Sequence, residues 1–419
     1  MGQIVTSATE VHVDDGFKWD HNFIKFVTGQ CLSFTGKGLM RFVLPLYVLI
    51  TTGNTALMGT ILAVSAIPSI LIAPISGVVV DRVKKNRLLA MVNIITALGI
   101  GLFWFLYQWV GIVVAVIFVM LILLTADSLT ALTGKSGVSA VSPPGALVKA
   151  NSILFLGISG CAMLKPIVGG FTLSRLGMNG VLIMSMAILL FATTINFLTD
   201  IPCCAKAADT NLIDTAKKDM KAGFRFTFKE EPTIGRVIIL VNMLFCITLW
   251  PLTSITLPIV LTGYFNQTEE IVGILSAVVG FGGVLGTILI GRLGEKVSIS
   301  MMRPLLFIAS LIILPLGLAL TFNASSSITL ALLILTIFAT FIVNSFLIII
   351  GRAYFGRKTP PDMIGKVMGI NSTFVLIGVA IGGYLYGLLF DRFPMDPGIV
   401  FLVLTVAGFF VASQAKIYK

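Results

Sequence analysis

Four ionisable side chains lie within long apolar stretches of this chain: Lys37, Arg41, Asp127 and Lys165. A charge at the centre of a helix in an apolar medium costs roughly 2.5 to 3.5 kcal/mol. Three unpaired cations there would be too costly, so each of them must pair or face water. We expect Asp127 to pair with Lys37, because counting about 1.5 Å per residue from the helix ends places these two side chains at similar depth.

Polar residues recur every three or four positions before this cluster, at Gln30, Ser33, Lys37 and Arg41. This spacing places all four on one face of a helix. A polar stripe on an otherwise apolar helix predicts that this face borders an aqueous cavity. Within it, Asp127 could act as a proton-coupled switch, ionised beside a cation in one state and protonated in the other. A static ion pair that fixes helix packing fits the sequence equally well.

The cluster contains three cations and one anion, which favours an anionic or zwitterionic solute over a cation. No acidic residue occupies a corresponding stretch in the second half of the chain, where neutral groups such as Asn344 supply polarity. Trp250, beside Pro251 and before Pro258, predicts a kinked helix. The indole offers a stacking surface for a solute, although a kink without solute contact is the commoner case.

The elements that position these residues follow from composition. Of 419 residues, 57% are apolar and 11% charged, whereas about a quarter are charged in a soluble domain. Apolar runs of about 18 residues or more predict membrane-spanning helices. We therefore expect an all-α membrane protein of twelve transmembrane helices in two pseudo-symmetric six-helix halves, at 22–50, 56–80, 88–107, 110–133, 153–174, 180–199, 236–261, 271–290, 302–322, 328–350, 367–390 and 398–413.

The predicted organisation has five parts. They are an N-terminal tail at 1–21, a six-helix half at 22–199, a linker at 200–235, a second half at 236–413 and a tail at 414–419. The linker carries basic residues beside Leu212, Met220 and Phe224, which is typical of an amphipathic helix on a membrane surface, while a solvated linker is an equal alternative.

The net charge of +11 has an uneven distribution. Two of the 29 Lys and Arg residues, Arg175 and Arg392, fall in one set of loops, and Lys37, Arg41 and Lys165 fall within helices. The other 24 lie in the tails, in the opposite set of loops or at the helix ends that adjoin them. The positive-inside rule places those segments in the cytoplasm, and with them both termini of a multi-pass protein of the plasma membrane.

The loop between the second and third expected helices carries a motif with Gly77, Asp81, Arg82 and Arg87. Glycine permits close helix approach, and the acid can pair with neighbouring cations. This Gly-x-x-x-Asp-Arg pattern resembles the signature loop of the major facilitator superfamily. The resemblance implies a major facilitator fold and a conformational gate at these residues.

A second motif narrows the resemblance. Pro166, Gly169 and Gly170 form a Pro-x-x-Gly-Gly element that is similar to the end of the antiporter motif in this superfamily. Together with Gln30, Ser33 and the Ala150-Asn151-Ser152 segment, it resembles the efflux branch that includes macrolide-efflux proteins and the enterobactin exporter. The chain departs from the pattern at Lys165, where glycine is usual, and at Gly291, where an acid is usual.

The expected function is export of a small organic solute, such as a drug or metabolite, by alternating access with proton antiport, including a role in multidrug or macrolide resistance. The alternatives are an uptake symporter of similar fold and a non-transporting membrane sensor or scaffold. We expect no enzymatic activity, no catalytic or metal-binding residues and no cofactor, since both histidines, His12 and His21, lie near the tail and no P-loop is present. The expected partners are a small-molecule substrate, protons and the lipid bilayer, not nucleic acid, and we expect a monomer.

Overall fold

The computed structural model describes residues 20–142, 146–202, 212–293, 298–322, 324–360, 363–394 and 396–414. These residues form helices and connecting turns and contain no strand. Ten of the helices in these ranges are long and apolar enough to cross a membrane. The expected all-α membrane architecture is therefore confirmed.

Five long helices build the first half. They are α1 (His21–Thr52), α2 (Thr55–Arg82), α3 (Lys85–Val110), α4 (Ile112–Val141) and α5 (Leu147–Phe197).

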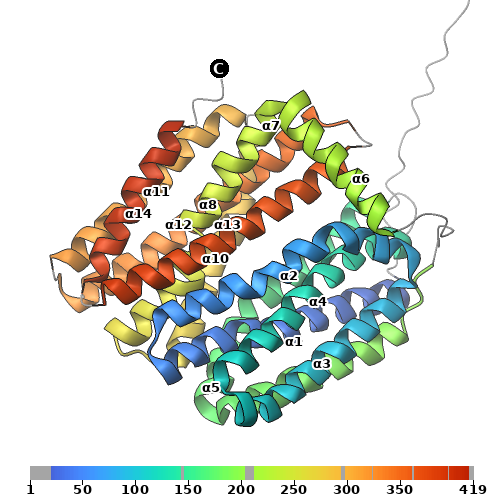
Figure 1. Ribbon diagram of the computed structural model, residues 1–419, viewed down its shortest axis with the longest axis horizontal. Coiled ribbons are helices and arrows are strands. Elements are labelled where there is room, and N and C mark those ends of the chain that lie inside the picture. The colour runs from blue at the N-terminus through green and yellow to red at the C-terminus, as the bar shows by residue number, and fades with distance from the viewer. Residues whose placement is uncertain are drawn as a thin grey trace, which may run out of the picture.

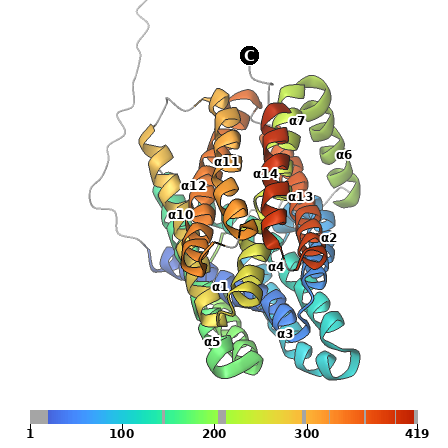
Figure 2. The ribbon, with the colours of Figure 1, turned by 90° about the vertical axis from the view of Figure 1, so that its left-hand side faces the viewer.

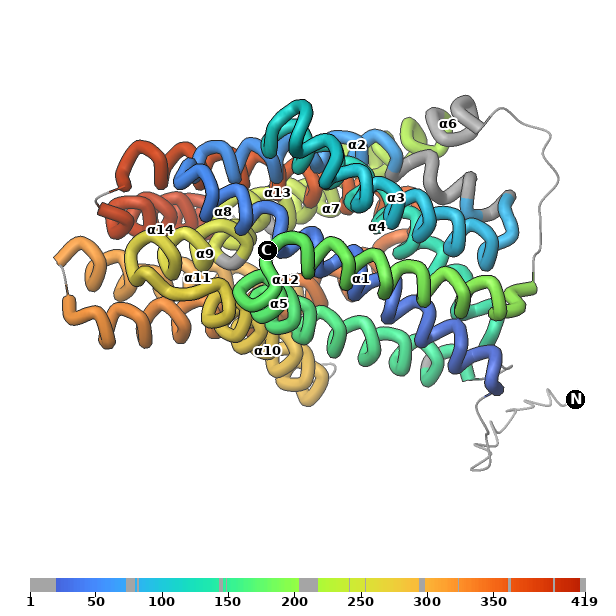
Figure 3. Tube along the Cα trace, turned by 90° about the horizontal axis from the view of Figure 1, so that it is seen from below, coloured from blue at the N-terminus to red at the C-terminus, as the bar shows by residue number. Residues whose placement is uncertain are grey.

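Helix α5 contains two of the predicted spans. Its 51 residues are interrupted at Gly177, where φ is 65° and ψ is −170°. This left-handed region strongly favours glycine, and the chain doubles back there into two arms that run alongside each other (Figure 3). Thr172 Oγ1 joins the arms by donating to Met184 Sδ at 3.4 Å.

The linker and second half contain helix α6 (Leu212–Arg225), a broken seventh span and five further long or medium helices. The five later helices are α10 (Glu269–Leu293), α11 (Met302–Thr321), α12 (Ser326–Lys358), α13 (Ile364–Arg392) and α14 (Pro397–Gln414). A single 3₁₀ turn, η6 (Ile299–Met301), lies between α10 and α11.

The seventh span, residues 232–264, is a succession of short segments and not a single kinked helix. Pro251 and Pro258 each lack a backbone donor, so the regular hydrogen-bond ladder cannot run through them. The segments alternate between α- and π-helical turns: η1 (Phe226–Glu230) precedes the span, which contains α7 (Pro232–Val237), η2 (Ile238–Met243), α8 (Leu244–Thr248), η3 (Leu252–Thr256), α9 (Leu257–Ile259) and η4 (Val260–Tyr264). With α5 counted as two spans and this segment as one, the described helices account for the twelve predicted spans.

The two halves form separate bundles that meet along two lines (Figure 1). Helix α2 lies against α13, and α5 lies against α10. In each contact the second span of one half meets the fifth span of the other, as expected for a pseudo-symmetric pair of six-helix units.

Both contacts depend on paired glycines. A Cβ added at Gly59 of α2 would lie 2.4 Å from the Gly383 carbonyl oxygen and 3.0 Å from Gly387 Cα on α13. A Cβ added at Gly273 of α10 would lie 2.2 Å from the Pro166 carbonyl oxygen and 3.3 Å from Gly170 Cα on α5. Both pairs lie near the end of the molecule where α1 ends and where α2 and α10 begin. We call this the closed end, and the opposite end, where α1 begins and α12 ends, the open end.

Helix α6 lies outside the two bundles, next to α13 and close to α2 (Figure 2). Lys366 Nζ of α13 pairs with Asp219 Oδ1 at 3.0 Å. The Phe228 ring packs at a tilt between the rings of Phe224 and Phe374, with centroids 4.5 and 5.6 Å away. The linker therefore docks a helix on the second half, while its location on a membrane surface stays a prediction.

Close packing at Gly223 yields a test of this docking. A Cβ at Gly223 would lie 3.0 Å from both Ile370 Cδ1 and Lys366 Cβ. The larger side chain of Gly223→Leu should displace α6 and speed tryptic cleavage after Lys221 several-fold in limited proteolysis. Gly365→Leu is the matched control, because nothing lies within 4 Å of a Cβ at that position. Equal cleavage rates in the two variants would show that α6 does not depend on this contact.

Candidate functional site

A cavity of about 1430 Å³ lies between the two halves. Helices α1, α2, α4, α5, α10, α12 and α13 and the seventh span all contribute to its lining. Its lining includes the exposed residues Leu147, Asn151 and Arg352, which lie near the open end. At the closed end, the glycine pairs hold the two halves together. The cavity is therefore accessible from the open end only.

Asp127 of α4 lies between two cations of α1. Its Oδ2 atom accepts a hydrogen bond from Arg41 Nη1 at 2.6 Å, and its Oδ1 atom lies 3.7 Å from Lys37 Nζ. The predicted Lys37–Asp127 pair is present. Arg41 makes the shorter contact with the same carboxylate.

Only part of the predicted polar stripe borders the cavity. Arg41 lines it, with 35% of its side chain exposed, whereas the Lys37 side chain is fully buried and donates to Thr130 Oγ1. Gln30 and Ser33 are also buried and lie outside the cavity lining. The expectation that the whole stripe faces the cavity is therefore corrected. Helix α1 is central in its half, so this face packs against α4 and α5.

Ser33, in the buried part of the stripe, belongs to a polar network that the sequence did not indicate. Ser33 Oγ accepts from Asn93 Nδ2 at 2.7 Å and from Asn196 Nδ2 at 3.4 Å, and donates to the Gly29 carbonyl at 2.7 Å. Asn93 and Asn196 come from α3 and the second arm of α5. Asn93 and Asn196 are distant from Ser33 in the sequence and meet it only through tertiary packing. No local sequence pattern could therefore have identified them.

Lys165 lines the cavity from α5 and has no carboxylate within 4.0 Å among the described residues. Its Nζ atom lies 4.6 Å from the centroid of the Phe34 ring, a cation–π contact. A Cβ at Gly38 would lie 2.7 Å from Lys165 Cδ, so the glycine leaves room for the lysine stem. With Lys37, Arg41 and Asp127 nearby, the deep part of the site carries an excess of positive charge.

The second half contributes Trp250, Asn344 and Arg352 to the cavity. The Asn344 Oδ1 atom is buried without a hydrogen-bond partner, so it is an available acceptor. Sequence reasoning assigned Arg352 to a basic loop and missed its place in the cavity. Its spacing from Asn344 and Ile348, at intervals of four residues on one helical face, is the signal that could have identified it.

The predicted gate residues have different surroundings. Gly169 packs on α1, where a Cβ would lie 3.1 Å from Val43 Cγ2, and Gly170 packs on α10 at the closed end, near Pro166. Arg87 is exposed in the first turn of α3. The side chains of three further gate residues, Gly77, Asp81 and Arg82, lie outside the described part of the structure.

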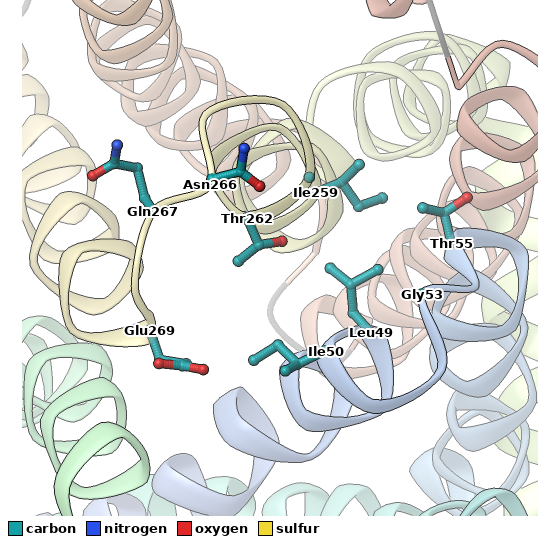
Figure 4. Close-up of a pocket in the computed structure, with 10 residues that line it drawn as sticks. Leu49, Ile50, Gly53, Thr55, Ile259, Thr262, Asn266, Gln267 and Glu269 are labelled. Carbon is teal, nitrogen blue, oxygen red and sulfur yellow. The ribbon is translucent and has the colours of Figure 1, made fainter.

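A smaller hollow of about 390 Å³ lies at the closed end (Figure 4). Leu49 and Ile50 of α1 face Thr262 and Glu269 across it, while Gln267 points away. Nearby, Arg175 Nη2 of α5 lies 3.8 Å from Glu270 Oε2 of α10, an ion pair between the halves. Such exposed pairs contribute less than about 1 kcal/mol, so the glycine contacts dominate closure.

Residues 238–417 match the family model described as Major Facilitator Superfamily. The whole chain is similar in structure to the nucleoside transporter NupG, with 16% identity, coverage of 94% of this chain and 98% of that chain, and a TM-score of 0.76. The chain is also similar to the inward-open xylose transporter XylE from E. coli, with 14% identity, coverage of 94% of each chain and a TM-score of 0.67. A third similar structure is a bacterial homologue of the iron transporter ferroportin in an inward-facing state, with 14% identity, coverage of 94% of this chain and 98% of that chain, and a TM-score of 0.69. No curated protein matches the chain.

At these identities the structural likeness establishes the fold. The chain has the major facilitator fold, and its second half carries the sequence pattern of that superfamily. The fold is that of solved membrane transporters, and a cavity lies between its two halves.

Proposed function

We propose that the protein exports a small organic solute by alternating access, with the two halves rocking about the central cavity. The cavity between the halves, open at one end and sealed by glycine contacts at the other, is the observation that carries this proposal. A cavity accessible from one side is what one state of such a cycle requires. Separation of the glycine pairs and approach of the open ends would produce the other state.

Topology supports export as the direction. The positive-inside rule puts the open end and both termini in the cytoplasm of a plasma-membrane protein. The structure then represents an inward-facing state that can collect solute from the cytoplasm. The resemblance of the Pro166–Gly170 element to the antiporter motif, and of the wider sequence to macrolide and enterobactin exporters, supports the same direction.

Proton exchange supplies the driving force in this proposal. Asp127 is the one acid in the charged cluster among the described residues, and it contacts two cations. In the outward-facing state, where the solute leaves, Asp127 would take up a proton and release Arg41 and Lys37. Loss of that proton to the cytoplasm in the inward-facing state would restore the ion pairs as the next solute binds, and the excess of cations in the site favours an anionic or zwitterionic solute. A monomer contains all of these parts.

Transport in inverted membrane vesicles tests the direction. An inside-acid pH gradient should drive solute accumulation if solute moves opposite to protons, and collapsing the gradient should stop it. Vesicles containing the Asp127→Asn variant provide the control for coupling. Accumulation under a gradient of the opposite sign would instead identify an uptake symporter.

A further inference from the structure

The contact between α5 and α10 loosens steadily from the closed end toward the open end. The helices touch at Gly170, where a Cβ would lie 3.1 Å from Gly273 Cα. Farther along the same face of α10, a Cβ at Gly280 would have Met163 of α5 as its nearest neighbour, at 3.9 Å. The two helices therefore leave a gap on the open side of the cavity.

Large apolar side chains border this gap. Phe155, Leu156 and Ile288 all line the cavity, and yet they are 57%, 67% and 50% exposed. Apolar groups of this size are costly in water at about 25 cal/mol per Å², whereas contact with lipid tails carries no such cost. At their position in membrane-spanning helices, this exposure favours a gap that joins the cavity to the bilayer.

Two cations mark the route from the gap into the cavity. At about 1.5 Å per residue, Arg352 lies about 9 Å from the open end of α12, and Lys165 lies about 27 Å along α5 from its first residue. Mostly apolar side chains lie between these depths, among them Ile348 and Met163. No Asp or Glu is among the residues that line the cavity in the described part of the chain.

We propose that the cavity binds a single-tailed anionic amphiphile, which enters from the bilayer leaflet through the α5–α10 gap. Arg352 meets the anionic group at the gap, and Lys165 binds it deep in the cavity while the tail lies along the apolar wall. The volume of about 1430 Å³ exceeds the 300 to 1000 Å³ typical of sites for compact ligands, which leaves room for a tail. This inference names the substrate class for the proposed export function and rests on it.

Photolabelling of the full chain in phosphatidylcholine liposomes tests the inference. The probe is a 14-carbon alkyl sulfonate with a diazirine in its tail, which stays anionic at any usable pH. The alcohol and trimethylammonium compounds with the same tail are the matched probes. We expect the sulfonate to label cavity-lining peptides of α5 and α10 at least tenfold more than either, as read by mass spectrometry.

Variants of the two cavity cations test whether sulfonate labelling depends on these side chains or on the positive charge of the protein in general. Lys165→Met should reduce sulfonate labelling about tenfold and Arg352→Gln several-fold, while Lys165→Arg should retain it. Arg357→Gln, an exposed arginine of the same helix outside the cavity lining, should label like the parent. Equal labelling by all three probes, or labelling unaffected by both charge-removing variants, would overturn the assignment of an anionic ligand.

Competition tests the bilayer route and keeps this inference distinct from the transport proposal. If benzenesulfonate, which stays in water, competes as well as the long-chain sulfonate, entry from the leaflet is wrong. Thiol accessibility at the closed end, measured in the same liposomes, reports alternating access without any solute. Normal alternation without sulfonate labelling would defeat this inference alone, whereas labelling without alternation or solute movement would defeat the transport proposal alone.

Discussion

The Asp127→Asn variant should lose solute movement driven by a pH gradient, falling to the level of empty liposomes. Asparagine keeps the shape of the side chain and can still accept a hydrogen bond from Arg41, but it cannot exchange a proton. Reconstituted protein under an imposed pH gradient provides the measurement. Asp391→Asn, which changes an exposed carboxylate in the last turn of α13, should transport like the parent.

Loss of folding must be distinguished from loss of coupling, because the same change leaves the buried Lys37 side chain without its carboxylate. Removing one partner of a buried ion pair costs about 3 to 5 kcal/mol. The double variant Lys37→Met with Asp127→Asn removes both charges and should recover thermal stability without recovering coupling. Gradient-driven transport by either variant would contradict the role proposed for Asp127 and favour a static ion pair.

The Gly273→Leu variant should be unable to seal the closed end. A Cβ there would lie 2.2 Å from the Pro166 carbonyl oxygen and 3.1 Å from its carbonyl carbon, and backbone atoms of a packed helix cannot move aside as a flexible side chain can. Helices α5 and α10 must then separate. Transport should fall at least tenfold, because the inward-facing state can no longer form.

Thiol accessibility reports this change directly. In a chain with its native cysteines replaced by serine, Cys introduced by Ser276→Cys lies in the cavity wall of α10. An impermeant reagent applied at the closed end should label it at least tenfold faster in the Gly273→Leu background than in the parent. Gly291→Leu is the control on the same helix, since a Cβ there meets nothing within 4 Å. Unchanged labelling together with retained transport would show that the glycine contact does not close the cavity.

The positions of the spans could be predicted from the sequence because they depend on local properties. The length of an apolar run must match the thickness of the bilayer core, and every backbone polar group must bond within its own helix. Lys37, Arg41, Asp127 and Lys165 could be identified for the same reason, since a charge within an apolar run must have a partner or water.

Tertiary packing decides which neighbouring helix each face of a helix contacts. Gln30, Ser33 and Lys37 share a face with Arg41, but only Arg41 borders the cavity, because α1 lies between other helices of its half. The predicted span ends at residue 350 and leaves Arg352 in a loop, whereas α12 continues to Lys358 and carries Arg352 in the cavity lining. The glycine pairs across α2–α13 and α5–α10 join residues more than one hundred positions apart. Local sequence sets what a helix is and how long it runs, whereas contacts between distant segments set where its side chains can act.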